Sequence, residues 1–265
     1  MIISDRHRFI FIHIPKCGGT TVRTALMPYD DHRAEFYDKG RSTHETLGEV
    51  DYHHLPLNVL RTHFPHAYEL LKTYPSYALT RDPMERFCSG VVYRFYQIKN
   101  KPKNSLTFDT FRNETSKIIK IIDKEKNKNT LPINYIHFTR QANYISDQGE
   151  VLLSTIYKLD NIKEFLKEIS EITCKNIEYY NENQSFYYKN RIASTIDPLA
   201  QRAVKKIVPR RIWKPVFSRL KISFMRRGII DRENTSYFQE ALTESQRAYL
   251  LDYYKEDAIL YAAAR

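Results

Sequence analysis

Cysteine is scarce in this chain, which has three in 265 residues. Cys17, Cys88 and Cys174 form an odd, widely spaced set that lacks the paired spacing of a zinc site and is too small for a disulfide framework. We therefore expect no metal ion and no structural disulfide. A reducing compartment suits such a chain best.

Long hydrophobic runs are also lacking. No apolar stretch approaches the roughly 20 residues that a membrane-spanning helix needs. The apolar patch within residues 1–14 has no small-residue cleavage site of the signal-peptide type, and it leads directly into a motif. Internal repeats are absent. We expect a cytoplasmic protein with one catalytic domain over residues 1–265, whose core lies within about residues 1–195.

Acidic residues are missing from residues 198–230, where ten lysines and arginines lie among aromatic and aliphatic side chains. One interpretation is a basic amphipathic insertion, packed on the core by its apolar stripe. The other is a surface that contacts an anionic glycan or, as a peripheral protein, the inner face of a membrane. The net charge of +11 indicates an anionic partner. The interleaved apolar residues and the lack of an RNA-binding or helix-turn-helix signature argue against nucleic acid.

Short β-branched and aromatic segments predict a buried parallel sheet. Residues 8–14 stop at Pro15 and residues 75–80 lead into Arg81, and a helical pattern follows each of them. Such junctions predict an α/β fold, with a parallel central sheet flanked by helices and a site at the carboxyl ends of the strands. The expected elements are strands over 8–14, 75–80 and 154–159, helices over 22–27, 55–74, 83–95, 108–122, 161–169 and 243–263, and an irregular region over 28–52.

The segment Pro15-Lys-Cys-Gly-Gly-Thr-Thr21 predicts an anion site between the first strand and its helix. Adjacent glycines allow backbone N–H groups to turn toward an anion, and the helix N-terminus and Lys16 add positive charge. Because Lys16 precedes the glycines, the order differs from the nucleotide-binding motif G-x-x-x-x-G-K-[ST]. The segment therefore predicts a phosphate-like ligand and disfavours an ordinary P-loop hydrolase.

A second anion site is indicated by Thr80-Arg-Asp-Pro-Met-Glu-Arg-Phe-Cys-Ser89. Arg81 ends a strand and Ser89 follows about two helical turns later, so both can reach one group if the helix folds back across it. Taken alone, the motif favours a plainer interpretation, in which Arg81 pairs with Asp82 or Glu85 and Ser89 is a surface residue.

Together the two motifs resemble those of carbohydrate sulfotransferases that use 3′-phosphoadenosine 5′-phosphosulfate (PAPS), namely sulfotransferase family 2, related to heparan sulfate 2-O-sulfotransferases. The resemblance extends through residues 136–141 and 156–160 and fades across 195–235. It implies a P-loop-like sulfotransferase fold, here with a helical basic C-terminal region, PAPS as donor, no metal, and an acceptor hydroxyl on a cell-surface polysaccharide or glycolipid. The resemblance also implies that Arg81 and Ser89 hold the 3′-phosphate, and that the 5′-phosphosulfate lies on Lys16, Cys17, Gly18, Gly19, Thr20 and Thr21.

Sulfuryl transfer needs a base for the acceptor hydroxyl and a cation for the departing phosphate. Lys16 is the expected cation. In the glycan enzymes that the chain resembles, a histidine between the two motifs is the base, and we expect this role for His54, then for His53, then for His44. Glu45 is a more remote candidate, since other sulfotransferase branches use a glutamate.

Two other functions stay open at this point. Cys17 and Arg23 have the C-x5-R spacing of cysteine-dependent phosphatases, with Asp82 as a candidate acid. That hypothesis leaves Lys16 and Ser89 without roles, and a Cys17→Ser variant would distinguish it. The third interpretation is a basic protein that binds membrane surfaces through residues 198–230, and it is compatible with catalysis.

Overall fold

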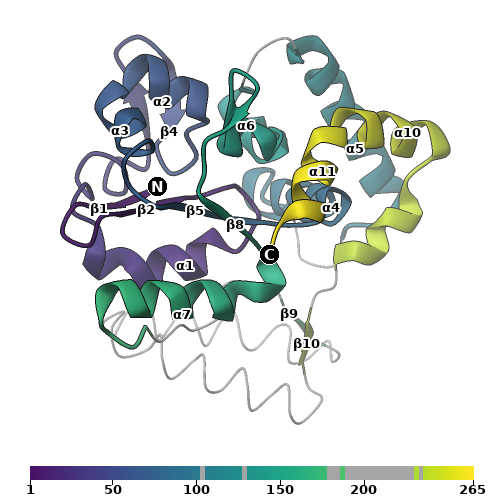
Figure 1. Cartoon of the computed structure of the whole chain (residues 1–265). Helices are drawn as coiled ribbons and strands as arrows, with labels where there is room; N and C mark the ends of the chain where they lie inside the picture. The colour runs from purple at the N-terminus through teal and green to yellow at the C-terminus, as the bar shows by residue number, and fades with distance from the viewer. Residues whose placement is uncertain (102–104, 127–129, 178–185, 189–229, 233–234) are drawn as a thin grey trace, which may run out of the picture. The chain divides into compact units, whose positions relative to one another are not determined.

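The computed structural model describes residues 1–101, 105–126, 130–177, 186–188, 230–232 and 235–265 (Figure 1). The chain divides into two units, Met1–Tyr180 with Thr235–Arg265, and Asn181–Asn234. In the second unit, β9 (Phe186–Tyr188) and β10 (Ile230–Arg232) form an antiparallel pair. The predicted basic insertion lies outside the described residues over 198–229, so its helices and its contacts stay predictions.

A four-stranded sheet organises the first unit. Its order is β1 (Ile2–Ser4), β2 (Phe9–Ile12), β5 (Ser76–Thr80) and β8 (Thr155–Lys158). The last three strands are parallel, whereas β1 runs antiparallel to β2. Every residue of β2 and β5 is buried, as expected for central strands covered on both faces. The predicted α/β fold is therefore confirmed, and β1 is an additional strand that is too short to show a pattern in the sequence.

Helices cover both faces of the sheet (Figure 1). One face carries α1 (Gly19–Leu26) and α7 (Ile162–Thr173), and the other carries α2 (Leu57–His63), α3 (Pro65–Leu70) and α6 (Ala142–Ile145). The single helix predicted over 55–74 is wrong, because two helices occupy this region. A proline disfavours helical geometry in the residue before it, and Phe64 has φ −137° and ψ 54°.

A second hydrophobic core lies among α4 (Pro83–Tyr93), α5 (Phe108–Glu125) and α10 (Glu244–Tyr253). The last helix, α11 (Lys255–Ala263), follows α10. Phe111 stacks on Phe238, with ring centres 4.7 Å apart. Thr243 and Gln246 form the predicted capping box at the start of α10. The helix predicted over 243–263 is nevertheless two helices. They meet at Tyr254, which is buried and donates its hydroxyl to the Phe138 carbonyl at 2.8 Å.

The region over 28–52 is more regular than predicted, because it contains a hairpin of β3 (Arg41–His44) and β4 (Gly48–Asp51). Its strands are polar and largely exposed, so they lack the buried alternation that marks a strand in a sequence. The remaining elements are β6 (Ser146–Asp147), β7 (Glu150–Val151), the 3₁₀ turns η1 (Met27–Tyr29), η3 (Ile133–Phe138), η4 (Leu159–Asn161) and η5 (Thr235–Ala241), and the π-helical turn η2 (Arg94–Ile98). None of the helices in the described ranges combines the length and the apolarity that crossing a bilayer requires.

Candidate functional site

Three parallel strands end at one edge of the sheet, where the predicted anion loop begins. β2 leads through Pro15 into the loop, β5 leads into Arg81, and β8 leads into Leu159. The loop packs on the last of these, because a Cβ atom at Gly18 would lie 2.4 Å from Leu159 Cδ1. Open α/β sheets bind ligands beyond the carboxyl ends of their parallel strands, so this edge is the candidate site.

The loop has the backbone geometry of an anion site. Lys16 and Gly18 adopt left-handed φ values of 66° and 72°, on either side of Cys17. Gly18 is the N-cap of α1, and the N–H groups of Gly18, Gly19 and Thr20 have no hydrogen-bond partner among the described residues. Alternating conformations of this kind turn N–H groups toward one point, and the helix end adds partial positive charge. Positive φ at a non-glycine residue is a strain often found at functional sites.

Two of the predicted loop residues use their N–H groups within the loop itself. The Cys17 N–H donates to the Ile14 carbonyl at 3.4 Å, and the Thr21 N–H donates to the Gly18 carbonyl at 3.0 Å. These bonds shape the turn. The N–H groups left without a partner within the loop are those between Cys17 and Thr21.

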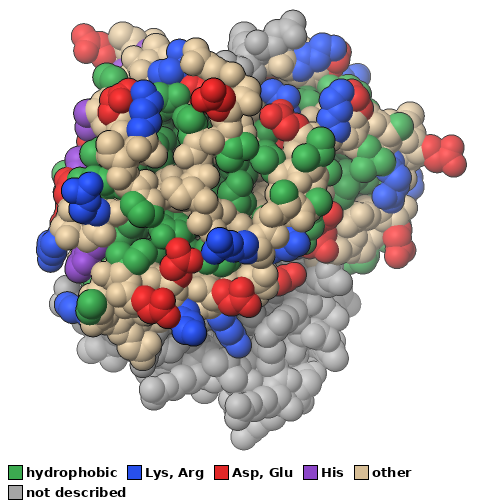
Figure 2. All heavy atoms as spheres, in the orientation of Figure 1, with side chains coloured by type: hydrophobic (Ala, Val, Ile, Leu, Met, Phe, Trp, Pro, Cys, Tyr) green, Lys and Arg blue, Asp and Glu red, His purple; other side chains and the backbone are tan. Residues whose placement is uncertain are grey.

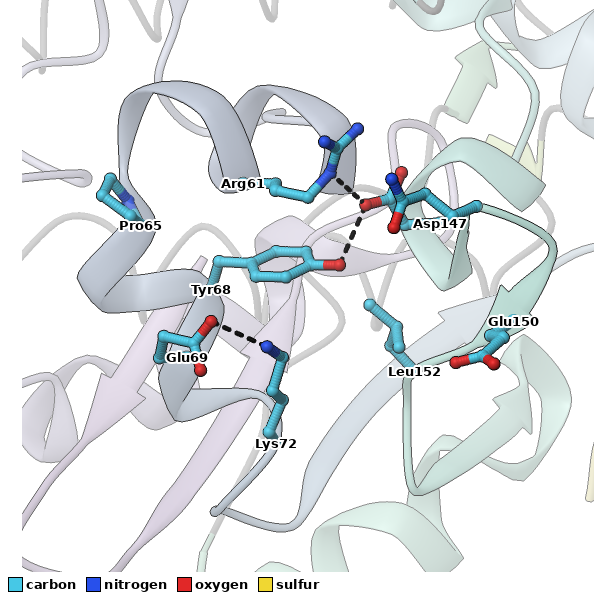
Figure 3. Close-up of a pocket in the computed structure, with 9 residues that line it drawn as sticks. Arg61, Pro65, Tyr68, Glu69, Lys72, Asp147, Glu150 and Leu152 are labelled. Atoms are coloured by element: carbon cyan, nitrogen blue, oxygen red, sulfur yellow. Dashed lines mark hydrogen bonds and ion pairs between the residues drawn. The ribbon is translucent and has the colours of Figure 1, made fainter.

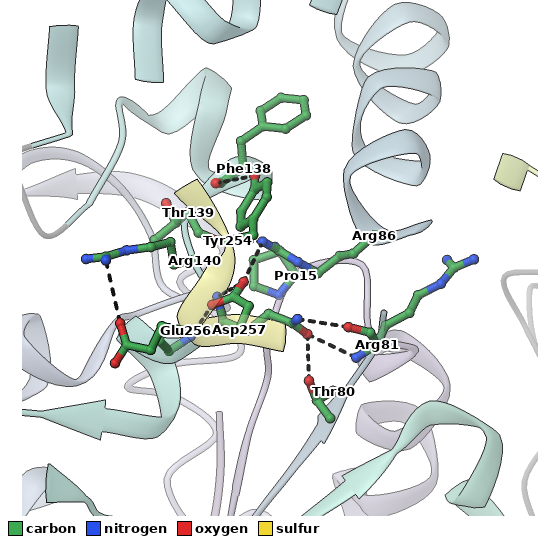
Figure 4. Close-up of polar contacts among 12 residues, drawn as sticks. Pro15, Thr80, Arg81, Arg86, Phe138, Thr139, Arg140, Tyr254, Glu256 and Asp257 are labelled. Atoms are coloured by element: carbon green, nitrogen blue, oxygen red, sulfur yellow. Dashed lines mark hydrogen bonds and ion pairs between the residues drawn. The ribbon is translucent and has the colours of Figure 1, made fainter. Parts of the chain in front are cut away.

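A buried polar network joins the loop to the neighbouring strand end (Figure 4). The Oε1 atom of Gln141 accepts hydrogen bonds from Cys17 Sγ at 3.1 Å and from the Arg81 N–H at 3.0 Å. The Gln141 N–H donates to Asp257 at 2.8 Å, and that carboxylate lies 3.5 Å from Arg86 in an ion pair with no exposed side-chain surface. These bonds link the two motifs through Gln141, although Nε of Arg86 is buried without a hydrogen-bond partner.

Three histidines are in contact beside the loop, and we call His13, His54 and His137 the histidine row. His54 Nδ1 donates to the His13 carbonyl at 3.1 Å, and the centres of these two rings are 4.3 Å apart. The His137 ring meets the His54 ring edge-on at 5.7 Å. His13 packs against the loop, because a Cβ atom at Gly19 would lie 1.7 Å from its ring. Since Nδ1 of His54 carries a proton, Nε2 carries the lone pair.

Tyr93 lies between Lys16 and the histidine row and contacts both. The Lys16 ammonium lies 4.4 Å from the centre of the Tyr93 ring, and that ring meets the His137 ring edge-on at 4.7 Å. Tyr93 is the last residue of α4 and is 37% exposed, so this end of the row reaches the surface. A cation and a basic nitrogen thus stand at two ends of one series of ring contacts.

Burial keeps the histidine row neutral. Loss of hydration lowers the pKa of His54 well below its usual value of 6.5. Burial also lowers the pKa of His137, with further contributions from His54 and Lys16, and it lowers the pKa of His13. A neutral imidazole has the free lone pair that a general base requires, and the lowered pKa makes it a weaker proton acceptor than an exposed histidine.

The second predicted anion motif begins α4. Asp82 caps this helix by accepting hydrogen bonds from two backbone N–H groups, at 2.9 and 3.0 Å. Arg81 Nε donates to Glu85 at 3.2 Å, which is the pairing that the plainer interpretation expects. The Arg81 side chain points away from Asp257 in Figure 4, and Ser89 is half-buried on the same helix. Arg81 thus stands at the strand edge with a carboxylate partner already in place.

Comparison with known families adds a decisive observation. The sequence model of the sulfotransferase family matches residues 1–262, which is nearly the whole chain. The chain belongs to the sulfotransferase family. No curated protein and no solved structure is significantly similar to it. Membership establishes sulfuryl transfer as the general activity, and it agrees with a phosphate-type loop at the end of a strand.

The other candidate bases of this sulfotransferase are placed differently from His54. His53 donates through Nε2 to the Tyr37 carbonyl at 3.0 Å, and its ring meets the His54 ring edge-on at 6.4 Å. His44 lies in β3, where its ring contacts those of residues 52, 63 and 64. Glu45 is exposed at the turn of the hairpin. Of the predicted bases, His54 is the one that contacts both other members of the histidine row.

Cysteine-based phosphatase chemistry finds no support in this sulfotransferase. The Cys17 side chain is buried and directed at Gln141, and burial raises the pKa of its thiol to about 12, whereas a nucleophile needs a thiolate near neutral pH. Arg23 lies 4.8 Å from the Tyr37 ring, and Asp82 is occupied as a helix cap. All three groups of the phosphatase hypothesis therefore have other structural roles.

Sequence analysis missed His13, His137 and Tyr93. His13 was counted as part of a buried strand, although a histidine that interrupts an apolar strand just before a loop is a usable signal. His137 lies on η3, far from the two motifs in sequence, and Tyr93 ends a helix otherwise explained by packing. The resemblance over residues 136–141 includes His137, but only the contacts in the folded chain place it and Tyr93 beside His54 and Lys16.

A pocket of about 410 Å³ lies between α3 and the β6–β7 hairpin (Figure 3). Five of its polar side chains are paired with one another, because Arg61 and Tyr68 both bond to Asp147, at 2.7 and 2.9 Å, and Lys72 bonds to Glu69 at 2.7 Å. None of its lining residues belongs to the loop or to the histidine row. We assign it no part in sulfuryl transfer.

Proposed function

We propose that this sulfotransferase transfers a sulfuryl group from PAPS to a hydroxyl of a carbohydrate acceptor. The observation that carries the proposal is the series of contacts from Lys16 through Tyr93 and His137 to His54, beside an anion-binding loop. It provides a cation and a neutral base in one site. The reaction needs both, because a hydroxyl loses its proton while charge builds on the departing phosphate.

The residues present fit both anionic ends of the donor. The N–H groups of Gly18, Gly19 and Thr20 at the start of α1 suit the 5′-phosphosulfate. Arg81 and Ser89 suit the 3′-phosphate, since arginine binds phosphate through two parallel hydrogen bonds. Glu85 competes with such a phosphate for Arg81. A variant without that carboxylate, Glu85→Gln, should therefore bind the 3′-phosphate more tightly.

The proposed step is an in-line displacement at sulfur. PAPS supplies the activated sulfuryl group. The acceptor oxygen forms a bond to sulfur while the bond between sulfur and the phosphate oxygen breaks, and Nε2 of His54 takes the acceptor proton. Lys16 leaves the face of Tyr93 and stabilises the negative charge on the departing phosphate oxygen. His137 positions the His54 ring through its edge contact.

The surroundings of Tyr93 support an acidic sugar as acceptor. On η3, Tyr135 has the guanidinium of Arg94 4.0 Å from its ring centre, and Arg41 donates to the Ile133 carbonyl at 2.8 Å. Aromatic rings offer broad apolar faces, and arginines bind carboxylates and sulfates. A cytoplasmic location and a membrane contact through residues 198–230 remain predictions.

Calorimetric titration with 3′-phosphoadenosine 5′-phosphate (PAP) tests the donor site before the acceptor is known. We expect PAP to bind more tightly than ADP or inorganic phosphate. Arg81→Ala should remove this preference, whereas Arg33→Ala, which breaks an exposed pair with Asp38, should keep it. Equal affinity for PAP and ADP in the wild type would contradict the donor assignment.

The role of Lys16 is tested by comparing transfer with binding. Lys16→Ala should reduce the rate of transfer far more than the affinity for PAP, because its stabilising contact forms as charge develops on the phosphate. Equal losses in both quantities would make Lys16 a binding residue only.

A further inference from the structure

A second group of titratable side chains lies outside the proposed site, and we call His32, Glu35 and His66 the surface cluster. Each places one nitrogen or oxygen atom within 4.8 Å of the others. Glu35 Oε2 lies 3.5 Å from His32 Nδ1 and 3.0 Å from His66 Nε2. The first two residues follow η1, and His66 belongs to α3. Histidine side chains also gather along one edge of the face drawn in Figure 2.

The spacing of these atoms matches that of ligands around zinc. Nitrogen and oxygen ligands lie about 2.0–2.2 Å from zinc, so two ligands in a tetrahedral arrangement are roughly 3.3 Å apart. Two separations of the surface cluster are close to this value. Two imidazoles and one carboxylate are a donor set that zinc accepts, and three protein ligands leave a fourth position open to water.

Asp5 contacts the other ring nitrogen of His32. Its Oδ2 atom accepts a hydrogen bond from His32 Nε2 at 2.8 Å, so Nε2 bears a proton. Nδ1 of His32 faces the carboxylate of Glu35. It donates to that carboxylate when His32 is protonated, and it offers a lone pair to an ion when His32 is neutral. A carboxylate on the far nitrogen of a ligating histidine is also the usual second contact in histidine-based zinc sites.

We propose that His32, Glu35 and His66 bind one zinc ion, with Asp5 orienting His32. The ion would tie the segment after η1 to the start of α3. The neighbouring Phe36 is buried, so the ion would hold a segment that is already anchored in the core. The site is separate from sulfuryl transfer and does not depend on the donor or the acceptor.

Zinc titration of the full-length, chelator-treated protein tests the proposal. We expect one ion per chain, and zinc should raise the melting temperature. Asp5→Asn should weaken binding about 10- to 100-fold, as second-contact changes usually do. His66→Ala should weaken it further and abolish the thermal effect. The His66 side chain is 51% exposed, so this variant should fold, which circular dichroism would check.

His63→Ala is the matched control. His63 and His44 are another pair of neighbouring histidines, with ring centres 5.5 Å apart, that zinc could bind instead. We expect it to bind zinc with wild-type affinity. Cobalt in place of zinc should give the visible absorption of a tetrahedral site in the wild type and in His63→Ala, but not in His66→Ala. The proposal is wrong if the wild type binds no zinc, if His66→Ala binds it unchanged, or if His63→Ala loses it.

Discussion

The histidine row and the surface cluster both contain histidines, but the electrostatic surroundings of these histidines are opposite. In the row, burial and positively charged neighbours lower the pKa values of His13, His54 and His137. In the cluster, burial alone would lower the pKa of His32, but hydrogen bonds with two carboxylates outweigh it and raise the pKa. Burial thus dominates in the row, whereas carboxylate partners outweigh burial in the cluster. A neutral imidazole beside Lys16 suits a base, and an imidazole between carboxylates suits a cation site.

Removing the proposed base from the histidine row should have the largest effect, and this effect should be on the rate of transfer. We expect His54→Ala to lower the rate of transfer about 10²- to 10⁴-fold, the usual contribution of a general base, while PAP affinity changes little. His63→Ala, a surface histidine, should keep the wild-type rate. The rates can be measured with labelled PAPS and a mixture of glycans. An equal loss in the adjacent variant His53→Ala would show that the assignment to His54 is wrong.

Breaking the buried network should have the next largest effect, this time on stability. Asp257→Asn removes the charge that pairs with Arg86, and Arg86 also donates to the His137 carbonyl at 3.1 Å. Breaking a buried ion pair costs about 3–5 kcal/mol. The matched change Asp252→Asn breaks an exposed pair, worth at most about 1 kcal/mol. Urea unfolding should separate the two variants, and equal unfolding midpoints would contradict a structural role for the network.

Acidification should act on the two histidine groups with opposite signs. His54 and His137 are neutral when folded, but the unfolded chain takes up their protons as the pH falls below 6.5, so acid favours unfolding. His32 has a raised folded pKa, so its contribution to stability is fully present below pH 6.5 and is lost as the pH rises through that folded pKa.

Urea midpoints measured at and below neutral pH check these signs. His137→Phe should make the loss of stability on acidification shallower, and His32→Asn should make it steeper. If His137→Phe left the pH dependence unchanged, the pKa of His137 would not be lowered in the folded protein.

The smallest effect is expected from Cys17→Ser. A serine hydroxyl can also donate to Gln141, so the variant should lose about 1 kcal/mol of stability or less and should keep most of its transfer activity. Activity and melting temperature can be compared with those of the wild type. Complete loss of activity in a folded variant would contradict a structural role for Cys17 and would favour the cysteine-dependent phosphatase.

The outline of the fold could be predicted because its signals are local. A buried strand, a glycine loop and a helix follow one another within residues 9–26, and a buried strand is again followed closely by a helix from Ser76 to Tyr93. The errors arose where one residue overrode a longer pattern, as Pro65 did in residues 55–74, or where polar strands resembled a loop, as in the hairpin of β3 and β4.

The sequence by itself determined the family, the strands and helices that flank the two motifs, and the residue types at the anion loop, because each depends on neighbours along the chain. Only the tertiary structure showed that His54, unlike the adjacent His53, contacts both His13 and His137. It also made Cys17 a buried thiol and assembled the surface cluster. Burial and contacts between distant residues set these pKa values and partners, and neither property can be derived from a local pattern.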